Sequence, residues 1–543
     1  LTGKAVPVTG SRAMVVTAHP VASQVGADVL RQGGNAIDAA VAVGFALAVV
    51  LPDAGNIGGG GFIVYREAAG RVRTLDYREA APQGATRDMY LDSLGNVTEQ
   101  SVTGHLAVGV PGSVAGMHEA WKAHGRLAWA AVLAPAIGLA RDGHAIDSAR
   151  SDDIRDDAER LGRFPASRRQ FLPGGRPPAP GTLWKQPDLA RTLQLISDSG
   201  PGAFYRGQIA DLIVAEMQRG GGGGGGLITR DDLRRYRAKW RTPIQLSYRG
   251  HTIYSMAPPS SGGVTMGEIL NVMEGFDTLP PFGSAGYTHR LVEAMRRAFQ
   301  DRNRWLGDPD FVDMPLQRLL SKSYAAGLRA QIDLRRATPT APPEASSREG
   351  PHTTHYSIVD AEGNAASVTT TLNNGFGSAV TVTGAGFLLN DEMDDFTSAP
   401  GKPNLYGLIQ GEANAIEPGK RMLSAMTPSI VLDPGGQLLM VVGTPGGPTI
   451  ITTVSQVILN ALDHGMSLPQ AVEAPRVHHQ ALPDEVRYER GGLSDATVSA
   501  LRTMGHEIER RRSTSGIVAA IMRGPNGWVG VADPRSAGGA VGW

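Results

Sequence analysis

Two adjacent threonines, Thr353 and Thr354, head a run of residues that is typical of a buried β-strand. If the chain is cut immediately before Thr353, the freed α-amine lies within reach of that residue's own hydroxyl, so one residue supplies both a nucleophile and a base. The same pair could instead simply begin a β-hairpin, where β-branched side chains are common. The segments around the pair have to decide between these two interpretations.

Alternating patterns after this pair predict a sheet-rich second part of the chain. Residues 353–359 and 365–372 form one expected hairpin, and residues 427–432 and 438–442 form another. A helix is expected over residues 449–462. Strand pairs with flanking helices predict an α+β sandwich built in layers.

Helices and a glycine cluster are expected in the first third of the chain. Residues 19–32 are predicted to form a helix ended by two glycines, and Asn35 is a good N-cap for an apolar helix that reaches Val50. Residues 56–61 end in four glycines and lead into an expected strand over 62–65. Because no P-loop lysine follows, we interpret these glycines as close backbone packing rather than as a phosphate site.

Composition argues against several classes of partner. The 543 residues carry 52 basic and 52 acidic side chains, so nothing favours nucleic acid or an anionic membrane surface. The chain has no cysteine, and therefore no disulfide framework or thiolate site. The longest apolar run, residues 39–51, is too short for a membrane span and predicts a buried helix. The chain starts at Leu1, which fits either a removed signal peptide or a trimmed end.

Two segments are expected to be pliable. A helix with Ile209 and Met217 on its apolar face should fray into a flexible surface loop over the glycines 220–226. Residues 337–350 are rich in Pro, Ala, Ser and Thr and are interpreted as a second linker, where exposed backbone would allow a cut before Thr353.

Two further segments would support acyl transfer at Thr353. Residues 443–447, Gly-Thr-Pro-Gly-Gly, lie between an expected strand and an expected helix, where backbone N–H groups and the positive helix end could form an oxyanion hole. An ordinary strand-to-helix turn is the alternative. Residues 369–373 continue the partner strand of Thr353, and one of their hydroxyls could orient the Thr353 oxygen. Threonine is also simply a common strand residue.

Charged and polar residues in three places could bind a small zwitterion. Residues 390–396 form a dense acidic segment behind an expected strand over 386–389. A solvated loop is its usual explanation, capture of a substrate ammonium is the functional alternative, and the spacing does not match an EF-hand Ca²⁺ loop. Arg78 and Ser424 together could hold a carboxylate. By itself, Arg78 would more simply form a structural ion pair.

The sequence does not support a metal site or a serine triad. His355, His478 and His479 have no His-x-x-x-His helix and no glutamate partner, so no metal site is predicted. No Gly-x-Ser-x-Gly elbow precedes a helix, which argues against a Ser-His-Asp triad.

Taken together, these residues resemble the γ-glutamyltranspeptidase family of N-terminal nucleophile hydrolases. The similarity extends from Asn35 to Gly542, and its most specific part lies between Thr353 and His479. That part contains, in the family's order, Thr-Thr-His-Tyr-Ser, Thr-Leu-Asn, Met-Asp-Asp-Phe, Leu-Ser, Pro-Gly-Gly and Ala-Pro-Arg-Val-His-His. Chance does not produce so many short motifs in one order.

The resemblance implies a precursor that cuts itself between His352 and Thr353. The large subunit would be residues 1–352 and the small subunit residues 353–543. The implied fold is a four-layer αββα sandwich made from both parts, and no cofactor is needed.

The resemblance also implies a role for particular residues. Thr353 would be the nucleophile and Thr371 its orienting hydroxyl, with Gly446 and Gly447 as oxyanion donors. Arg78 and Ser424 would hold the substrate α-carboxylate, whereas Asn373, Glu392 and Asp395 would hold its α-amino group. A lid over residues 400–407, carrying Tyr406, would cover the glutamyl pocket.

The implied reaction moves the γ-glutamyl group of glutathione or a related compound through an ester on Thr353 to water or to an amino acid or peptide. One position departs from the family: Ala425 follows Ser424 where two serines are common, and the lost hydrogen bond would weaken glutamyl binding by about 1–3 kcal/mol. A glutaryl-type cephalosporin acylase is therefore the first alternative, although the acidic pair favours a free-amino substrate. A poly-γ-glutamate depolymerase and a non-catalytic glutamyl-binding protein are further alternatives. The family also implies export to the periplasm or the cell exterior.

Overall fold

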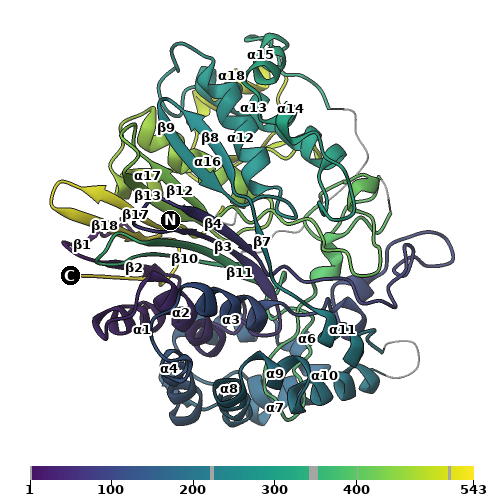
Figure 1. Ribbon diagram of the computed structural model, residues 1–543. Coiled ribbons are helices and arrows are strands. Elements are labelled where there is room, and N and C mark those ends of the chain that lie inside the picture. The colour runs from purple at the N-terminus through teal and green to yellow at the C-terminus, as the bar shows by residue number, and fades with distance from the viewer. Residues whose placement is uncertain (1–2, 221–224, 341–352, 400, 512–514) are drawn as a thin grey trace.

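Two seven-stranded antiparallel sheets lie face to face at the centre of the molecule (Figure 1). The computed structural model describes residues 3–220, 225–340, 353–399, 401–511 and 515–543. The first sheet has the order β1 (Val8–Gly10), β18 (Gly527–Ala532), β17 (Ala519–Gly524), β13 (Leu438–Gly443), β12 (Ser429–Leu432), β9 (His251–Ser255) and β8 (Ile244–Tyr248). The second has the order β19 (Gly539–Gly542), β2 (Met14–Thr17), β10 (Thr353–Val359), β11 (Ala365–Thr371), β3 (Gly60–Arg66), β4 (Val72–Asp76) and β7 (Lys239–Arg241).

The facing surfaces of the two sheets bury an apolar core. Its members include Val359 of β10, Ile430 of β12 and Val441 of β13, all fully buried. Successive side chains of a strand point to opposite faces, so the face of β10 that carries Val359 also carries Thr353. The hydroxyl of Ser357 on this face donates to the carbonyl of Ala519 in the opposite sheet at 2.9 Å. Thr353 is therefore directed toward the space between the sheets.

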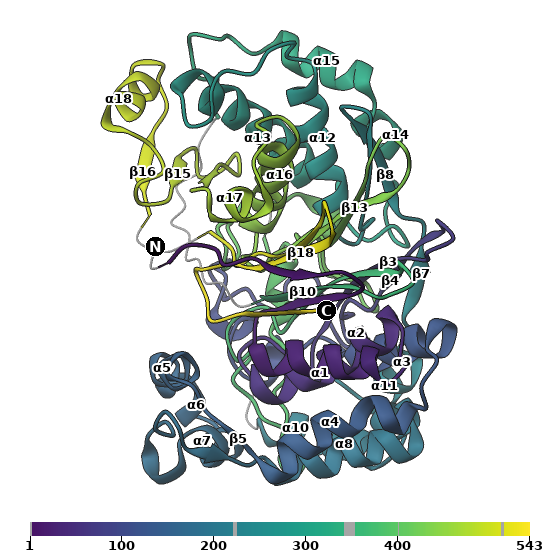
Figure 2. The same cartoon turned by 90° about the vertical axis from the view of Figure 1, so that its left-hand side faces the viewer.

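Helices cover both outer faces and complete four layers (Figures 1 and 2). The second sheet packs against α1 (Pro20–Arg31), α2 (Ala36–Val50) and α3 (Ser113–His124). Behind them, α4 (Trp129–Asp142) packs on α2, and α8 (Pro187–Ser199) packs on α4. The first sheet packs against α12 (Gly262–Glu274), α16 (Thr449–Leu462) and α17 (Leu468–Glu473). Behind them, α13 (Ala285–Trp305) packs on α12, and α18 (Asp495–Thr503) packs on α13. The chain thus has the predicted α+β architecture of an αββα sandwich.

Smaller elements surround this sandwich. They are the helices α5 (Ser148–Asp156), α6 (Ala158–Gly162), α7 (Pro165–Phe171), α9 (Pro201–Tyr205), α10 (Gln208–Arg219), α11 (Arg230–Arg235), α14 (Leu316–Leu319) and α15 (Lys322–Ala330). Short strands are β5 (His144–Ala145), β6 (Leu183–Trp184), β14 (Val477–His478), β15 (Val486–Tyr488) and β16 (Ile508–Arg510). Single turns of 3₁₀-helix are η1 (Glu99–Ser101), η2 (His105–Ala107), η3 (Pro173–Gly175), η4 (Glu392–Asp395) and η5 (Glu412–Asn414). Within the described ranges, no helix combines the length and apolarity that crossing a bilayer requires.

Elements with strong local signals were predicted correctly. The Asn35 side chain accepts hydrogen bonds from the backbone N–H groups of Ile37 and Asp38, so it caps α2 as expected. Both predicted hairpins and the helix over 449–462 are confirmed. The glycine cluster does pack closely, because a Cβ on Gly59 would lie 2.1 Å from the carbonyl oxygen of Thr371.

One predicted element is wrong, and two predicted segments lie partly outside the described residues. The expected strand over 386–389 is absent from the described structure, where Leu388 makes only an isolated bridge with Thr381. Gly386 has a φ of +75°, which interrupts an extended strand. Of the expected glycine loop, residues 221–224 lie outside the described residues, and so do residues 341–350 of the expected linker.

Candidate active site

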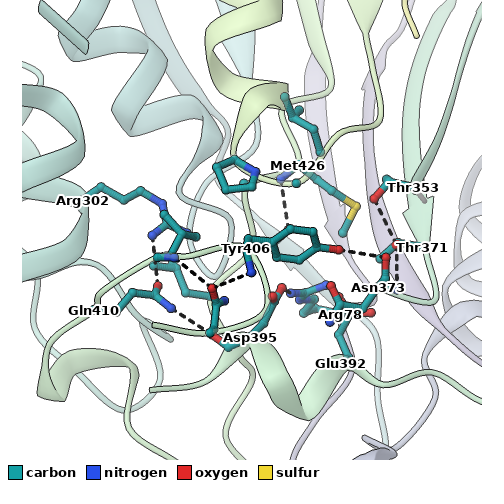
Figure 3. A pocket seen from close by; sticks show the side chains of 18 residues that line it. Arg78, Arg302, Thr353, Thr371, Asn373, Glu392, Asp395, Tyr406, Gln410 and Met426 are labelled. Carbon is teal, nitrogen blue, oxygen red and sulfur yellow. Dashed lines mark hydrogen bonds and ion pairs between the residues drawn. The ribbon is translucent and has the colours of Figure 1, made fainter. Parts of the chain in front are cut away.

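The hairpin β10–β11 brings the two predicted hydroxyls together. Thr353 begins β10 and Thr371 ends β11, and the antiparallel register places them directly opposite each other. Their Oγ1 atoms are 3.1 Å apart, and both residues are buried (Figure 3). The backbone N–H of Asn373 donates to Thr371 Oγ1 at 2.8 Å. Thr371 is therefore in the right position to orient the Thr353 oxygen.

The predicted oxyanion segment connects β13 to α16. Gly446 and Gly447 both have left-handed backbone angles, with φ of +133° and +54°, which favour glycine. Among the described residues, neither N–H group donates a hydrogen bond. Gly447 lines the pocket that contains Thr353, whereas Gly446 is one residue removed from its wall. The turn can thus present free N–H groups beside the positive end of α16.

Arg78 forms the charged centre of this pocket. Its guanidinium makes ion pairs with Glu392 and Asp395, and its Nε donates to the carbonyl of Met422 at 3.2 Å. Of the alternatives left open for the acidic segment, a solvated loop does not apply to Glu392, which is only 1% exposed within η4. The free-energy cost of burying these two carboxylates is offset because the Arg78 guanidinium lies between them.

Burial changes the protonation of the acidic residues in η4. It raises the pKa of Glu392 to about 7, although Arg78 opposes this shift. The pKa of Asp395 is also raised by burial and lowered again in part by Arg78. Burial alone would lower the pKa of Arg78, but Glu392 and Asp395 raise it, so the guanidinium remains protonated.

Tyr406, from the segment expected to form a lid, lines one side of the pocket. The Tyr406 hydroxyl donates to the carbonyl of Asn373 at 3.0 Å, and a Cβ on Gly447 would lie 2.9 Å from the Tyr406 ring (Figure 3). Of the expected lid, Pro400 lies outside the described residues. The pocket has a volume of about 20 Å³, which holds little more than one water.

Ser424 and Ala425 also line the pocket. The Ser424 hydroxyl accepts the backbone N–H of Met426 at 3.1 Å. Ala425 is 9% exposed and brings no polar group to the wall. The ten residues predicted from the sequence, Gly446 included, therefore lie in or next to one pocket.

Comparisons with known proteins agree with this geometry. A sequence model of the family described as gamma-glutamyltranspeptidase matches residues 22–543. The chain belongs to this family. A glutathione hydrolase proenzyme from Pseudomonas sp. (strain A14) is 48% identical over 97% of this chain and 94% of that protein. The corresponding proenzyme from Escherichia coli (strain K12) is 46% identical over 98% of this chain and 91% of that protein.

A solved structure supports the fold of this family member along its whole length. The cephalosporin acylase from Bacillus halodurans superimposes with a TM-score of 0.89 at 29% sequence identity, covering 100% of this chain and 98% of that chain. The gamma-glutamyltranspeptidase family thus accounts for both the sequence and the layered fold, and the chain is an enzyme of this family.

The sequence analysis missed a buried arginine of this gamma-glutamyltranspeptidase pocket, Arg302, and its partner Gln410. Arg302 of α13 lines the pocket, donates from Nη1 to Gln410 Oε1 at 3.0 Å, and has its pKa lowered to about 10 by burial. Arg302 follows Met295 and Phe299 on the buried face of α13. A charged side chain on an apolar helix face was the available signal.

Among the histidines that the sequence analysis considered as possible metal ligands, His355 has a structural hydrogen bond. His355 bonds to Thr369 Oγ1 at 2.8 Å, and burial lowers its pKa to about 3. A different group, His289, Glu293 and His506, is close enough together to hold a metal ion. Several of its atoms are already engaged, because the two histidines bond to each other at 2.8 Å and Glu293 pairs with Arg297, whereas His506 Nδ1 has no hydrogen-bond partner among the described residues. None of the three lines the Thr353 pocket.

Proposed function

We propose that this chain is a self-processing γ-glutamyl hydrolase and transferase that acts on glutathione and related γ-glutamyl compounds. One observation carries the proposal: Arg78 lies between Glu392 and Asp395 in a pocket that also contains the Thr353–Thr371 pair. An exported location stays a prediction from the family resemblance.

The charges of the pocket favour a substrate that is itself a zwitterion. A γ-glutamyl group carries a carboxylate and an ammonium on one carbon, so the carboxylate can pair with Arg78 while the ammonium pairs with the two acids. Each buried charge then keeps a partner. A glutaryl group brings only the carboxylate and would draw Arg78 away from Glu392, and an uncompensated buried charge costs about 3–5 kcal/mol.

The chemistry follows from the position of Thr353. Its hydroxyl oxygen adds to the γ-amide carbon while its own α-amine takes the proton, and the developing oxyanion faces the N–H groups of Gly446 and Gly447. The C–N bond breaks as the amine leaves with that proton, and an ester on Thr353 remains. Water or an incoming amine then attacks the ester carbon and restores the hydroxyl. The lid has to open before substrate can enter so small a space.

Maturation uses the same oxygen on the preceding residue. The Thr353 hydroxyl attacks the carbonyl carbon of His352, which lies outside the described residues, and the peptide C–N bond breaks as an ester forms. Hydrolysis of that ester leaves a carboxylate on residue 352 and a free amine on Thr353. This produces the base that the catalytic cycle requires.

Two measurements test the proposal. Wild-type enzyme should hydrolyse a γ-glutamyl anilide at least about 100-fold more efficiently than the matching glutaryl anilide, from the charge argument above. A preference for the glutaryl compound would instead indicate an acylase, like the cephalosporin acylase from Bacillus halodurans. Added glycylglycine should accelerate turnover only if the enzyme transfers as well as hydrolyses.

The second measurement concerns the proposed self-cleavage before Thr353. Thr353→Ala should give one uncut, inactive chain on a denaturing gel. Thr354→Ala is the matched control, because Thr354 points to the other face of β10 and its hydroxyl has no partner among the described residues. It should be cut, with Thr353 as the new N-terminus. Two fragments from the Thr353 variant would contradict the maturation step.

A further inference from the structure

A second cavity lies on the outer side of the lid. It has a volume of about 490 Å³, which is large enough for a peptide, and we call it the outer groove. Its wall includes Thr98, Arg160, Arg163, Asn374, Asn404 and Leu405. Asn404 also lines the inner pocket that contains Thr353, so the two cavities meet at this residue.

The outer groove begins close to the reacting atoms. Asn374 follows Asn373, whose backbone N–H donates to Thr371 Oγ1 at 2.8 Å. Thr371 Oγ1 is in turn 3.1 Å from Thr353 Oγ1. A dipeptide joined to the scissile amide at Thr353 is about 7 Å long when extended, and the inner pocket of about 20 Å³ cannot hold it as well as the glutamyl group.

The two arginines of the groove have different roles. Arg160 is committed to the protein: it pairs with Asp157 and donates to the carbonyls of Gly375 and Gly377. It thereby holds the loop after Asn373, in which Phe376 has a strained φ of +58°. Such strain persists only where the surroundings enforce it, so Arg160 acts as a positioning residue.

Arg163 is available to a ligand. Among the described residues its guanidinium pairs only with Glu159, at 2.7 Å, and both side chains are well exposed. An exposed pair of this kind contributes less than about 1 kcal/mol, so a carboxylate can replace Glu159 at little cost. The nearby Asp394 does not compete, because its oxygens bond to Ser101 Oγ and to the N–H of Leu405.

Asn404 offers a donor where the cavities meet. Its Oδ1 accepts the N–H groups of Tyr406 and Leu408 at 3.1 and 3.0 Å, which fixes the orientation of the side chain. Its Nδ2 is buried and has no hydrogen-bond partner within the described part of the chain. A buried donor without a partner costs about 1–3 kcal/mol, which a ligand carbonyl would recover.

We propose that the outer groove binds the amine half of the substrate, with a terminal carboxylate on Arg163 and a peptide carbonyl on Asn404. This rests on the proposed function. The occupant is the dipeptide that leaves from a γ-glutamyl tripeptide, and by microscopic reversibility also the peptide that accepts the glutamyl group. The inner pocket thus selects the γ-glutamyl part, and the outer groove selects peptides with a free C-terminus.

The test compares glutathione with glutathione whose terminal carboxylate is amidated. The wild-type ratio of kcat/KM for the acid over the amide should be about tenfold, the value of one charge-assisted hydrogen bond. Arg163→Ala should reduce this ratio to about 1, and Arg163→Lys should restore most of it. Arg155→Ala is the matched control, since Arg155 is an exposed arginine paired with Asp152 on α5, and it should leave the ratio unchanged.

The possible results separate this proposal from the function on which it rests. A wild-type ratio near 1, or an Arg163→Ala ratio equal to that of the wild type, would overturn the outer groove while γ-glutamyl turnover still supported the enzyme. Failure of the wild type to turn over any γ-glutamyl compound would overturn the proposed function itself. Circular dichroism of each variant checks that its fold is intact.

Discussion

At the residue scale, two short hydroxyl side chains carry most of the chemical argument. Thr353 and Thr371 meet because they occupy the first and last positions of two paired strands. Among the described residues, the Thr371 hydroxyl at 3.1 Å is the hydrogen-bond partner of the Thr353 oxygen, and we expect this bond to fix where that oxygen points. Misplacing a reacting atom by about 1 Å can cost 100-fold in rate.

Replacing Thr371 by valine tests this directly, because valine keeps the shape and removes the hydroxyl. We expect Thr371→Val to lower kcat on a γ-glutamyl anilide about 100-fold with little change in KM. Thr371→Ser, which keeps the hydroxyl, should recover most of the loss. Rates are to be normalised to the cut fraction on a denaturing gel. A valine variant with wild-type kcat would remove the orienting role.

At the scale of elements, the lid depends on contacts with the acidic helix η4. The carboxylate of Asp394 accepts the N–H of Leu405 at 2.8 Å and the hydroxyl of Ser101 at 2.7 Å. Burial raises the pKa of Asp394 from 3.8 to about 6, although both hydrogen bonds oppose the shift. The folded protein thus binds this proton more tightly than the unfolded chain does.

The pH dependence of stability follows with a definite sign. Protonation of Asp394 contributes fully to the free energy of unfolding below pH 3.8. This contribution is lost as pH rises through about 6, since the unfolded chain releases the proton at a lower pH than the folded protein does. The loss amounts to about 3 kcal/mol. Asp394→Asn has no carboxyl at this position and should not lose this stability. The free energy of urea unfolding of the variant, relative to that of the wild type, should therefore increase between pH 4 and pH 6. Asp142→Asn, at an exposed carboxyl whose pKa Arg141 lowers, should show no such gain.

At the scale of the whole molecule, the two expected subunits are interleaved. In the second sheet, β10 and β11 lie between β2 and β3, which precede the predicted cut. In the first sheet, β12 pairs with β9 across the same boundary. A cut before Thr353 would therefore break one peptide bond and leave the strand pairing within each sheet intact.

The matured protein should consequently behave as one folding unit. We expect both fragments to co-elute in size-exclusion chromatography and to unfold in a single calorimetric transition. The uncut Thr353→Ala variant serves as the reference and should melt within a few degrees of the mature protein. Separation of the fragments in a non-denaturing buffer, or two well-resolved transitions, would contradict the interleaved arrangement.

The sequence by itself determined the elements whose causes are local. Asn35 caps α2 because its side chain reaches N–H groups two and three residues ahead, and the β10–β11 hairpin follows from alternation around a short turn. The resemblance of motifs then supplied the candidate residues. Local signals could not show whether the acidic segment over 390–396 is solvated or buried.

Only the tertiary structure decided how the charges are paired. Arg78 meets Glu392 and Asp395 more than 300 positions further along the chain, and Arg302 reaches the same pocket from α13. Such contacts leave no local pattern, because the cost of burying each charge is offset by a partner from a distant segment. The outer groove likewise exists only where α6, the lid and the loop after Asn373 come together.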